Sequence, residues 1–311
     1  MKVLVTGGSG FIGSRLVKVL VEEGAQVHVL TRAPQKYDRV HGVVTVKGDL
    51  ATDISIDLSS YEVIYHCAGE ISNPEQMYKV HVEGTLKLLK QVEPRTRWVQ
   101  LSSVGVYGSR IADVVCENNA FAPVGDYEKT KAESEALVKR YCIENGIAFS
   151  VLRPSIVFGR DMKNQSIIQL IHSIKSGRFV YFSNPASVVM NYVHVDDVVD
   201  ALLMCGMSER AVGQDYIVND PISLKDLVGI VSPEGRFLRV PKYLALFLTK
   251  VLEILKIKSP ITESRVRALT NKTIYSSRKI EDQLDFRYLV GVEKGVREMV
   301  DFYIRQNDSI Q

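Results

Sequence analysis

The sequence predicts an α/β protein built on a doubly wound parallel β-sheet, with a smaller, mostly helical C-terminal lobe. In the first half, short apolar runs rich in β-branched residues alternate with longer amphipathic stretches. Such alternation, with strands apolar on both faces, is typical of a parallel sheet that helices cover on both sides. Beyond about residue 155 the alternation loosens, and from about 222 to 311 the chain is mostly helical and interrupted by prolines. This change of pattern predicts the second lobe.

Six runs in the first half are predicted to be strands because they are short, apolar and rich in β-branched residues. They span residues 2–6, 26–31, 43–48, 63–68, 97–103 and 148–154. Three amphipathic stretches between them are predicted to be helices, at residues 11–24, 77–92 and 127–146. Right-handed crossovers between parallel strands then place helices on both faces of the sheet.

The second half mixes its elements less regularly. Strand-like patterns occur at residues 190–195 and 214–220, and helical ones at 166–177 and 196–205. We therefore expect a larger domain over 1–155, with sheet contributions from about 185–220, and an interleaved smaller lobe over 156–311. A cleft between two such lobes is the expected place for a ligand.

The composition disfavours several classes of function. The 311 residues are 46% hydrophobic and 24% charged, with a net charge of +3 and no block of like charges, so a nucleic-acid-binding role has little support. The four cysteines are scattered without zinc-site spacing, which predicts reduced thiols in a cytoplasmic protein. We find no signal peptide and no apolar run of about 18 residues, and therefore expect no stable membrane insertion.

The start of the chain predicts a dinucleotide site. Gly8, Gly10 and Gly13 form a G-x-G-x-x-G pattern directly after a predicted strand and at the start of a predicted helix, the context that makes this motif informative. Glycines permit a tight turn and close approach of the backbone to a pyrophosphate, which the unpaired N–H groups of the helix N-terminus bind. In this Rossmann arrangement the expected cofactor-binding residues are Gly7, Gly10, Phe11, Ile12 and Gly13.

The residue after the second strand bears on the choice of cofactor. Arg32 stands about 20 residues beyond Gly13, where a dinucleotide site often carries an acid for the adenine ribose. A guanidinium suits a 2′-phosphate instead, because it offers paired N–H donors. Arg15 is a second candidate for this phosphate. We therefore expect NADP(H) in preference to NAD(H), whereas a merely solvated Arg32 would tolerate either cofactor.

The ends of the third and fourth strands are also expected to contact the cofactor. Asp49 and Leu50 follow the third strand, where the carboxylate can accept from the adenine amino group or instead cap the next turn. Ala68 and Gly69 end the fourth strand with small residues, which suits a backbone lying against a cofactor. His66, just before them, is interpreted as a packed or hydrogen-bonded residue rather than a metal ligand.

Tyr127 and Lys131 lie four residues apart on one predicted helix, so their side chains share a face. Tyrosine titrates at about 10 and is a poor base at neutral pH, but a neighbouring ammonium favours the phenolate and lowers the pKa. Such a pair can take a proton from an alcohol, or give one to a ketone, while hydride moves to or from nicotinamide. The spacing alone is common by chance, but it is informative after a dinucleotide motif and a Ser-Ser strand end.

With these residues in place, the chain resembles the extended short-chain dehydrogenase/reductase family, which includes nucleotide-sugar epimerases, dehydratases and ketoreductases. The matching motifs run from residue 3 to about 202: Thr6-Gly7 with Gly10 and Gly13, HCAG (66–69), SSVGVYG (102–108), Tyr127 with Lys131, LRPSIVFG (152–159) and NYVHVDDVVDAL (191–202). The resemblance implies Ser103, Tyr127 and Lys131 as catalytic residues, with Ser103 holding the reacting oxygen and Ser102 facing the sheet. It also implies that Tyr127, Lys131 and Pro154 contact the cofactor.

Two departures from the family pattern change the expectations. His81 stands where the family usually carries an asparagine that steadies a strand near the active site. Val104 and Gly105 stand where sugar dehydratases place an acidic pair beside the catalytic hydroxyl. Elimination then lacks a local acid and base, so dehydration is disfavoured.

We therefore expect hydride transfer at a sugar carbinol or ketone, with a nucleotide-diphosphate-sugar 4-ketoreductase ahead of a 4-epimerase because Arg32 favours NADP(H). A steroid- or flavonoid-type hydroxy compound is an alternative substrate. A non-catalytic dinucleotide sensor is a further alternative, which the Tyr127–Lys131 pair disfavours. The apolar helix predicted at 241–258 can line a substrate pocket or touch a membrane surface, or it can pack on the smaller lobe or at a dimer contact. A homodimer is expected.

The remaining charged residues have simpler interpretations. His194, Asp196 and Asp197 cluster, but the two aspartates are expected to begin a helix, where carboxylates meet the positive end of the dipole, and no metal is expected. Arg153 is expected to anchor a strand end near the cleft. The phosphates of a nucleotide sugar would need cations from the smaller lobe, for which the candidates are Arg178, Arg236 and Arg265.

Overall fold

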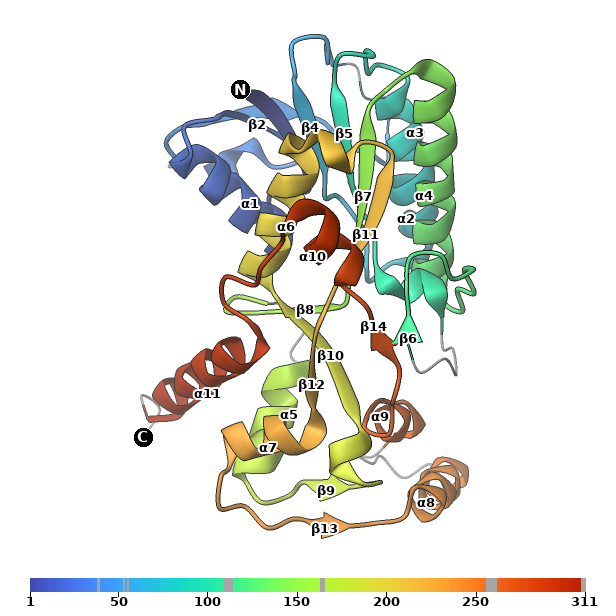
Figure 1. Cartoon of the computed structure of the whole chain (residues 1–311), viewed down its shortest axis with the longest axis vertical. Helices are drawn as coiled ribbons and strands as arrows, with labels where there is room; N and C mark the ends of the chain where they lie inside the picture. The colour runs from blue at the N-terminus through green and yellow to red at the C-terminus, as the bar shows by residue number, and fades with distance from the viewer. Residues whose placement is uncertain are drawn as a thin grey trace.

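A parallel sheet of seven strands forms the centre of the molecule (Figure 1). The computed structural model describes residues 1–37, 40–52, 54, 56–108, 114–162, 166–255 and 262–308, without the side chains of 303 and 306–308. The strand order is β11-β7-β5-β4-β1-β2-β3, and every neighbouring pair is parallel. The strands are β1 Lys2–Thr6, β2 Gln26–Thr31, β3 Val43–Lys47, β4 Val63–His66, β5 Arg97–Leu101, β7 Phe149–Pro154 and β11 Gln214–Val218. The order reverses beside β1, which confirms the doubly wound α/β fold.

Helices cover both faces of this sheet, as the apolar strands predict. On one face lie α1 (Phe11–Glu22), α6 (Val195–Met207) and α10 (Arg278–Leu284). On the other face lie α3 (Gly84–Leu89) and α4 (Asp126–Asn145). The carboxyl ends of the strands point toward the second lobe, so residues that follow β1, β4 and β5 gather at that edge (Figure 1).

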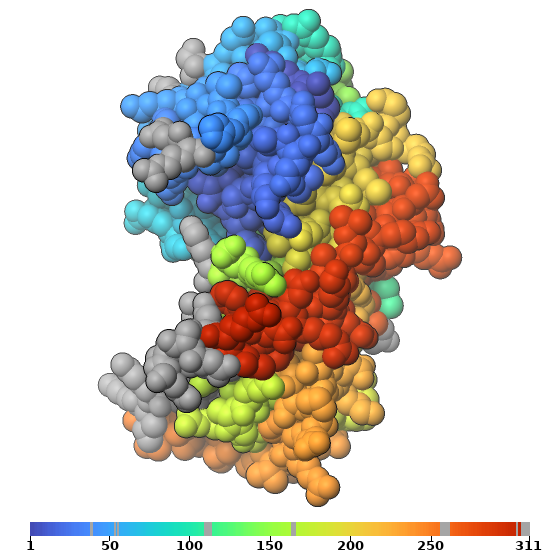
Figure 2. Space-filling model, turned by 90° about the vertical axis from the view of Figure 1, so that its left-hand side faces the viewer, coloured from blue at the N-terminus to red at the C-terminus, as the bar shows by residue number. Residues whose placement is uncertain are grey.

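The second lobe combines small sheets with helices. β8 (Ile156–Phe158), β10 (Val189–His194) and β12 (Asp220–Ser223) form a three-stranded sheet, in which β10 is parallel to β8 and antiparallel to β12. The other short strands pair as β9 (Val180–Tyr181) with β13 (Leu238–Arg239) and β6 (Val114–Val115) with β14 (Ile274–Tyr275). The helices are α5 Ser166–Lys175, α7 Leu224–Val231, α8 Lys242–Ile254, α9 Glu263–Ala268 and α11 Val292–Asp308. In Figure 2 the red C-terminal segment crosses the narrow middle of the molecule, between the blue upper lobe and the orange lower lobe.

The chain passes from the main sheet into the lower lobe at Asn219, between β11 and β12. The backbone N–H of Asn219 donates to Ser277 Oγ (2.7 Å), and its carbonyl oxygen accepts from Tyr288 OH (2.6 Å). Its side-chain amide donates to Asn191 Oδ1 (3.1 Å) and to the carbonyl oxygen of Tyr275 (2.8 Å). The crossing point is therefore held by hydrogen bonds from several elements.

Two predicted strands have different partners from those expected. The strand predicted at 214–220 is two strands in different sheets, because β11 pairs with β7 whereas β12, after Asn219, pairs with β10. The strand predicted at 190–195 is β10, which belongs to the three-stranded sheet. Of the described residues between 185 and 220, β11 supplies the strand that joins the seven-stranded sheet.

The helix predicted at 77–92 is divided into three parts. It begins earlier, as α2 (Pro74–Tyr78), because Pro74 occupies the first turn and Asn73 accepts from the backbone N–H of Glu75. A π-helical turn, η2 (Lys79–Glu83), then leads into α3. Gly84 follows this turn, and a Cβ there would lie 2.6 Å from the carbonyl oxygen of Leu50. The π-turn thus ends where the helix passes directly against the backbone of Leu50.

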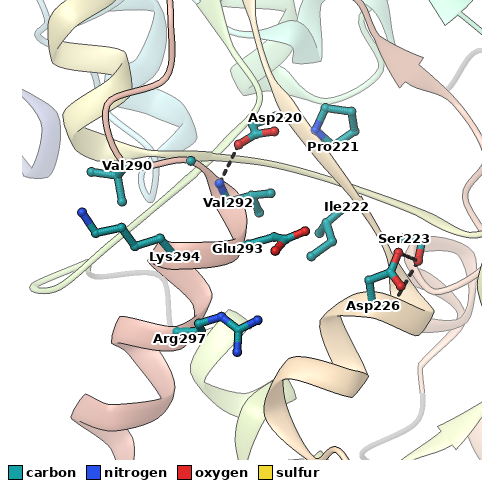
Figure 3. Close-up of a pocket in the computed structure, with 11 residues that line it drawn as sticks. Asp220, Pro221, Ile222, Ser223, Asp226, Val290, Val292, Glu293, Lys294 and Arg297 are labelled. Carbon is teal, nitrogen blue, oxygen red and sulfur yellow. Dashed lines mark hydrogen bonds between the residues drawn. The ribbon is translucent and has the colours of Figure 1, made fainter.

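A polar cavity of about 470 Å³ lies between β12, α7 and the start of α11 (Figure 3). Asp220 Oδ2 accepts from the backbone N–H of Val292 (2.5 Å), and Ser223 caps α7 through the N–H of Asp226 (3.0 Å). Asp220, Ser223 and Asp226 are thus engaged at the starts of α11 and α7, and none of the predicted site residues lines the cavity.

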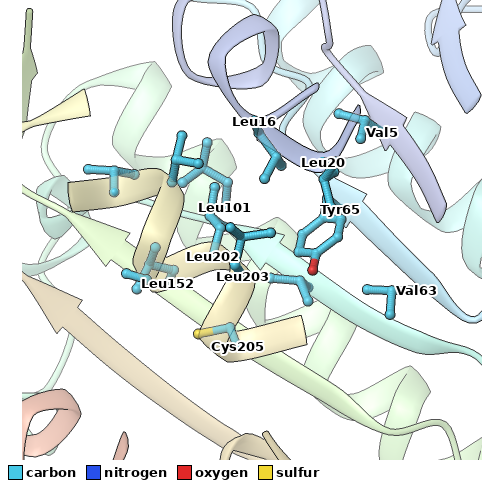
Figure 4. Close-up of a cluster of buried hydrophobic side chains, with 14 of the residues drawn as sticks. Val5, Leu16, Leu20, Val63, Tyr65, Leu101, Leu152, Leu202, Leu203 and Cys205 are labelled. Carbon is cyan, nitrogen blue, oxygen red and sulfur yellow. The ribbon is translucent and has the colours of Figure 1, made fainter. Parts of the chain in front are cut away.

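The core between the sheet and α1 and α6 is closely packed (Figure 4). Leu16 and Leu20 from α1 and Leu202 from α6 are fully buried against the strands. A Cβ at Gly206 on α6 would lie 2.2 Å from the hydroxyl oxygen of Tyr65. The glycine therefore lets α6 approach the sheet at this ring. This packing fixes α1, whose N-terminus faces the strand ends.

Candidate active site

The glycine loop between β1 and α1 forms a backbone cradle. Gly7 has a φ of +69°, and a Cβ there would lie 2.6 Å from the backbone nitrogen of Ala68. A Cβ on Gly13 would lie 2.3 Å from the carbonyl oxygen of Gly7. Gly10 caps α1 without a side chain over the first N–H groups of the helix. The open helix N-terminus and the bare backbone beside it fit a dinucleotide pyrophosphate.

A chain of hydrogen bonds joins this loop to the next strand end. The backbone N–H of Ala68 donates to Thr6 Oγ1 (3.2 Å), which is 2.9 Å from His66 Nδ1. His66 Nε2 is 2.9 Å from Thr85 Oγ1, which donates to the carbonyl oxygen of His81 (2.6 Å). Burial, and next the charge of Lys131, lower the pKa of His66 to about 3, so the ring is neutral. His66 is hydrogen-bonded and packed, as the sequence indicates.

The adenosine end of the predicted cofactor site is less enclosed. Asp49 Oδ1 accepts from the backbone N–H of Ala51 (3.0 Å), which is the turn-capping alternative for this residue. Arg32 is exposed after β2. Hydrogen bonds from the backbone, first from Ser72, lower the pKa of Glu70, and the charge of Arg32 lowers it further. Arg32 therefore lies near Glu70, at the ends of β2 and β4.

Arg15 has a partner within the fold. Its Nε and Nη2 donate to both carboxylate oxygens of Asp196 on α6, at 2.5 and 3.1 Å. This bidentate pair links α1 to the first turn of α6. Arg15 therefore has a structural role, and its contact with a 2′-phosphate stays a prediction.

The proposed catalytic residues come together at the end of β5. Ser103 caps the short helix η3 (Val104–Tyr107), and its Oγ accepts from the backbone N–H of Gly105 (3.1 Å). Lys131 is buried, and its Nζ donates to the carbonyl oxygen of Leu101 (3.0 Å), two residues before Ser103. Tyr127 lies in the first turn of α4, one turn before Lys131. Lys131 thus reaches the strand end that carries Ser103, and Tyr127 precedes it by one turn on the same helix.

The electrostatics of the Tyr127–Lys131 pair differ from the expectation. Burial lowers the pKa of Lys131 to about 8. Burial, followed by the charge of Glu128, raises the pKa of Tyr127 to about 12. The expected lowering of the tyrosine pKa is therefore wrong for this structure, because Lys131 is directed to the Leu101 carbonyl and the charge felt by Tyr127 is negative.

Glu128 is a site residue that motif reasoning missed. A Cβ at Gly105 would lie 2.9 Å from Glu128 Cγ and 3.4 Å from Ser103 Oγ. A Cβ at Gly125 would lie 2.4 Å from Glu128 Oε2. Two glycines therefore leave room for this carboxylate beside Ser103. The sequence shows no acid after Ser103, but the fold brings one there from α4, so the absence of an acidic pair at Val104 and Gly105 is not an absence of acid.

His81, which stands where the family usually carries an asparagine, is hydrogen-bonded through both ring nitrogens. Its Nε2 accepts from the backbone N–H of Glu70 (2.9 Å), so its proton resides on Nδ1, which donates to Thr130 Oγ1 (2.8 Å). Thr130 Oγ1 in turn donates to the carbonyl oxygen of Asp126 (2.8 Å). The His81 ring meets the Tyr127 ring edge-on at 5.7 Å. Burial, and then Lys131, lower the pKa of His81 to about 3, so a neutral ring ties the β4 loop to α4.

Ser102 and Ser155 carry buried hydroxyls near these strand ends. Ser102 is 4% exposed and Ser155 is 7% exposed, and neither Oγ has a hydrogen-bond partner among the described residues. Ser102 follows β5, and Ser155 follows Pro154 at the end of β7, the strand beside it. Two unpaired hydroxyls at adjacent strand ends fit the polar carboxamide of a nicotinamide, which supports the predicted place of the cofactor.

Arg153 lies in the interior of the larger lobe rather than at the cleft. It is 1% exposed and pairs with Glu135 on α4 and with Asp215 on β11. Its Nη1 donates to Tyr107 OH (2.6 Å). Arg153 thus joins α4, β11 and the η3 turn that follows Ser103, so its anchoring role extends to three elements.

The HVDDV segment serves structure. His194 caps α6 by accepting from the backbone N–H of Asp196 (3.3 Å). The buried Asp197 accepts from the backbone N–H groups of Leu289, Val290 and Gly291. Both aspartates lie in the first turn of α6, as expected. Within the described part of the chain no cluster of histidine, cysteine and acidic side chains has metal-binding geometry.

An apolar pocket of about 670 Å³ lies in the lower lobe, lined by α5, β9, β10 and α9. Met190 and Tyr192 of β10 line it, and the far end of β10 lies near the glycine loop. There, a Cβ at Gly159 would lie 3.3 Å from His194 Nε2 and 3.4 Å from the Phe11 ring. One strand thus leads from the cofactor end to the pocket.

Two of the three predicted phosphate-binding arginines line this pocket. Arg178 and Arg265 are in its walls, whereas Arg236 is exposed and not among its lining residues. Arg265 Nη2 donates to Gln169 Oε1 (2.5 Å), which holds the guanidinium against α5. The walls therefore combine apolar and aromatic side chains with two cations.

Comparison with known proteins identifies relatives of two kinds. The chain is 26% identical over 350 residues to 3beta-hydroxysteroid-dehydrogenase/decarboxylase isoform 1 of Arabidopsis thaliana, covering 96% of this chain and 79% of that protein. For isoform 2 the chain spans 61% of the relative's length. It is also 26% identical over 234 residues to UDP-glucose 4-epimerase of Vibrio cholerae, covering 70% of each.

Solved structures share the fold over nearly the whole chain. UDP-glucose 4-epimerase from Thermotoga maritima, solved with UDP-glucose, matches with a TM-score of 0.71 and 21% identity over 99% of both chains. UDP-glucuronic acid 4-epimerase from Bacillus cereus, solved with NAD, matches with a TM-score of 0.74 and 18% identity over 98% of this chain and 99% of that one.

The match to a family model is broader than any single motif. The model describes the NAD dependent epimerase/dehydratase family and covers residues 3–219, from β1 to the crossing at Asn219. This span contains the glycine loop, Ser103, Tyr127 and Lys131. The chain therefore belongs to the NAD dependent epimerase/dehydratase family, within the extended short-chain dehydrogenases/reductases, and is a nicotinamide-dinucleotide-dependent enzyme of that type.

Proposed function

We propose that this enzyme transfers hydride between a nicotinamide cofactor and a carbinol or ketone carbon of a nucleotide-diphosphate sugar, acting as a 4-ketoreductase. The observation that carries the proposal is the convergence of Ser103, Tyr127 and Lys131 at the end of β5. A Cβ on Gly69, beside the glycine loop, would lie 3.4 Å from Lys131 Nζ, so the trio borders the proposed cofactor cradle. Residues 1–155 with β11 would bind the cofactor, and residues from 156 onward the substrate.

Each residue of the trio has a separate role in this proposal. The bound cofactor supplies the hydride. Ser103 donates a hydrogen bond to the reacting oxygen, and Tyr127 gives that oxygen its proton. The raised pKa of Tyr127 keeps its hydroxyl protonated at neutral pH, which suits a proton donor to a ketone. Lys131, held on the Leu101 carbonyl, supplies positive charge beside Gly69 at the border of the cofactor cradle.

The glycine loop and neighbouring strand ends would hold the cofactor. Gly7, Gly10 and Gly13 provide the backbone approach to the pyrophosphate. Ser102 and Ser155 supply unpaired hydroxyls for the carboxamide. Arg32 supports a preference for NADP(H), because it is an exposed cation at the end of β2 that no described salt bridge occupies.

The lower-lobe pocket supports a nucleotide-diphosphate sugar as substrate. Arg178 and Arg265 provide positive charge for a diphosphate. Phe179, Phe182 and Tyr192 provide flat apolar surface for a base. A substrate that spans the two lobes would then present its sugar to Ser103 and Tyr127.

Two other functions have specific support. The Vibrio cholerae relative and both compared structures are named as 4-epimerases, which supports 4-epimerisation on the same residues. The Arabidopsis relatives, named as 3beta-hydroxysteroid enzymes, align over 96% of this chain. Together with the mostly apolar pocket walls, this supports a steroid-like hydroxy compound. A homodimer remains part of the proposal.

One set of assays separates these functions. The purified chain is incubated with NADPH and a UDP-4-keto sugar, with UDP-glucose, or with a 3β-hydroxysteroid and NADP⁺, and products are followed by NMR. A ketoreductase consumes one NADPH for each keto sugar reduced. Conversion of UDP-glucose to its 4-epimer without net cofactor consumption would establish the epimerase instead, and turnover of the steroid alone would overturn the sugar proposal.

Tyr127→Phe tests the catalytic assignment. Without the hydroxyl, Tyr127 cannot give a proton to the reacting oxygen. Turnover should therefore fall by about a thousandfold or more, a loss typical of removing a positioned general acid. Cofactor affinity, measured by nicotinamide fluorescence, should stay near that of the wild type. Retained turnover would remove Tyr127 from this role.

A further inference from the structure

Helix α8 exposes an apolar face at the outer end of the lower lobe (Figure 1). Tyr243, Phe247 and Ile254 are 76%, 63% and 79% exposed, far more than large apolar side chains in a packed helix. Spacings of four and seven residues place them on one side of the helix. Leu244, Leu248 and Leu255 extend the same face and are also exposed.

The opposite side of α8 is packed into the lower lobe. Ala245 is 2% exposed and Thr249 is 7% exposed, and Ala245 lies in a cluster with Phe182 and Val266. The helix is therefore seated on the protein by one side, so its exposed face is a fixed surface. We call this surface the α8 face; its residues are Tyr243, Leu244, Phe247, Leu248, Ile254 and Leu255.

Basic side chains surround the α8 face. Arg236, Arg239, Lys242 and Lys250 are exposed within residues 234–255, against two acidic residues in the same range, Glu234 and Glu253. Leu238, 78% exposed on β13, adds a further apolar side chain beside Arg239. An apolar helix face bordered by a surplus of cations is the pattern of a helix that lies in an anionic membrane interface.

We propose that the α8 face binds the surface of an anionic lipid bilayer, with its apolar side chains at the headgroup–acyl boundary and its basic neighbours on lipid phosphates. A spanning role does not fit, because no helix in the described ranges is long and apolar enough to cross a membrane. A second copy of the chain fits less well, because pairing two α8 faces would bring two surplus-cationic surfaces together.

The residues on which α8 packs also form part of the wall of the apolar pocket. Val180, Phe182 and Leu269 line the pocket and pack in the cluster that holds Ala245. Docking at the α8 face therefore brings the pocket close to the bilayer. The inference concerns where the enzyme resides and does not depend on the substrate in the proposed function.

Vesicle co-sedimentation of the full-length protein tests this inference. The wild type should pellet with vesicles of phosphatidylcholine mixed with phosphatidylglycerol, with a partition coefficient about tenfold or more above that for pure phosphatidylcholine. Phe247→Glu should lower the partition coefficient by about tenfold or more, because a carboxylate replaces a buried ring in the interface. Arg239→Glu, which leaves the apolar face intact, should weaken binding to the anionic vesicles and leave binding to the neutral vesicles little changed.

A matched control makes the result interpretable. Leu289→Glu places the same charge at a residue that is 64% exposed on the loop before α11, away from α8, and it should pellet like the wild type. Thermal melting and cofactor fluorescence of each variant check that the fold is kept. Failure of the wild type to pellet with anionic vesicles would overturn the proposal. So would a dimer in light scattering that Phe247→Glu dissociates without any vesicle binding, which would assign the face to a second copy.

Discussion

Individual residues around the Tyr127–Lys131 motif set the pKa values at this site. The Tyr-x-x-x-Lys spacing puts Tyr127 and Lys131 one turn apart on α4, but the charge that raises the tyrosine pKa comes from Glu128, inside the motif. No acid follows Ser103 directly in the sequence, and residue order alone does not show that Gly105 and Gly125 leave room for one from α4. The missing information was three-dimensional, although the two glycines were its sequence signal.

A pH profile should report both ionisations. The pKa of Lys131, lowered to about 8 by burial, means that its ammonium is present below that pH and lost above it. We therefore expect kcat/KM for ketone reduction to fall as pH rises through about 8. In Glu128→Gln the negative charge beside Tyr127 is gone, so the pKa of Tyr127 decreases from about 12. A second alkaline limb, set by loss of the Tyr127 proton, should then move to lower pH, whereas the Lys131 limb near 8 stays in place.

The control for this experiment is Glu144→Gln, near the far end of α4. It makes the same chemical change away from the site and should leave the profile where it is. If Glu128→Gln does not move the limb that reports Tyr127, then Glu128 has no electrostatic influence on Tyr127, the proposed proton donor.

Among the elements, β5, η3 and α4 carry the site, and their relative positions depend on buried polar contacts. Six strands of the central sheet and helix α4 were predicted within a few residues, because apolar periodicity sets them locally; the strands are β1, β2, β3, β4, β5 and β7. The division of the helix at 77–92 was not predicted, since the π-turn accompanies contacts of His81 with Glu70 and Thr130. Periodicity carries no information about such tertiary contacts.

Removing Arg153 should loosen these elements together. Arg153→Met leaves Glu135, itself 1% exposed, without its partner, and removal of one member of a buried ion pair costs about 3–5 kcal/mol. Urea denaturation should show this loss in the free energy of unfolding. Arg210→Met breaks the exposed pair with Asp285 instead, and should lower the free energy of unfolding much less, because water screens an exposed pair. Equal losses in the two variants would contradict the structural role of Arg153.

At the scale of the whole molecule, the two lobes were predictable but their boundary was not. The change of pattern near residue 155 indicated a second lobe. The stretch at 214–220 reads as one strand, and nothing in its sequence shows that Val218 and Asp220 belong to different sheets. Likewise, the sequence suggested a helix at 241–258 without showing which face it buries; residues 256–258 lie outside the described residues.

Cofactor preference can be measured through the thermal stability of the whole protein. A ligand that binds the folded state raises the melting temperature by mass action. We expect NADPH to raise it more than NADH at equal concentration, because Arg32 adds a contact to the 2′-phosphate. Arg32→Ala should remove the difference between the cofactors, whereas Arg95→Ala, an exposed arginine paired with Glu93, should preserve it. A larger shift with NADH in the wild type would contradict the NADP(H) preference.

The crossing at Asn219 has a consequence for movement between the two lobes. Its backbone and side chain are hydrogen-bonded to Asn191, Tyr275, Ser277 and Tyr288, which come from several segments of the chain. Rotation of one lobe against the other would strain all of these bonds in one step. Opening the two lobes about Asn219 would therefore have to break these hydrogen bonds, so the angle between the lobes is part of the folded geometry.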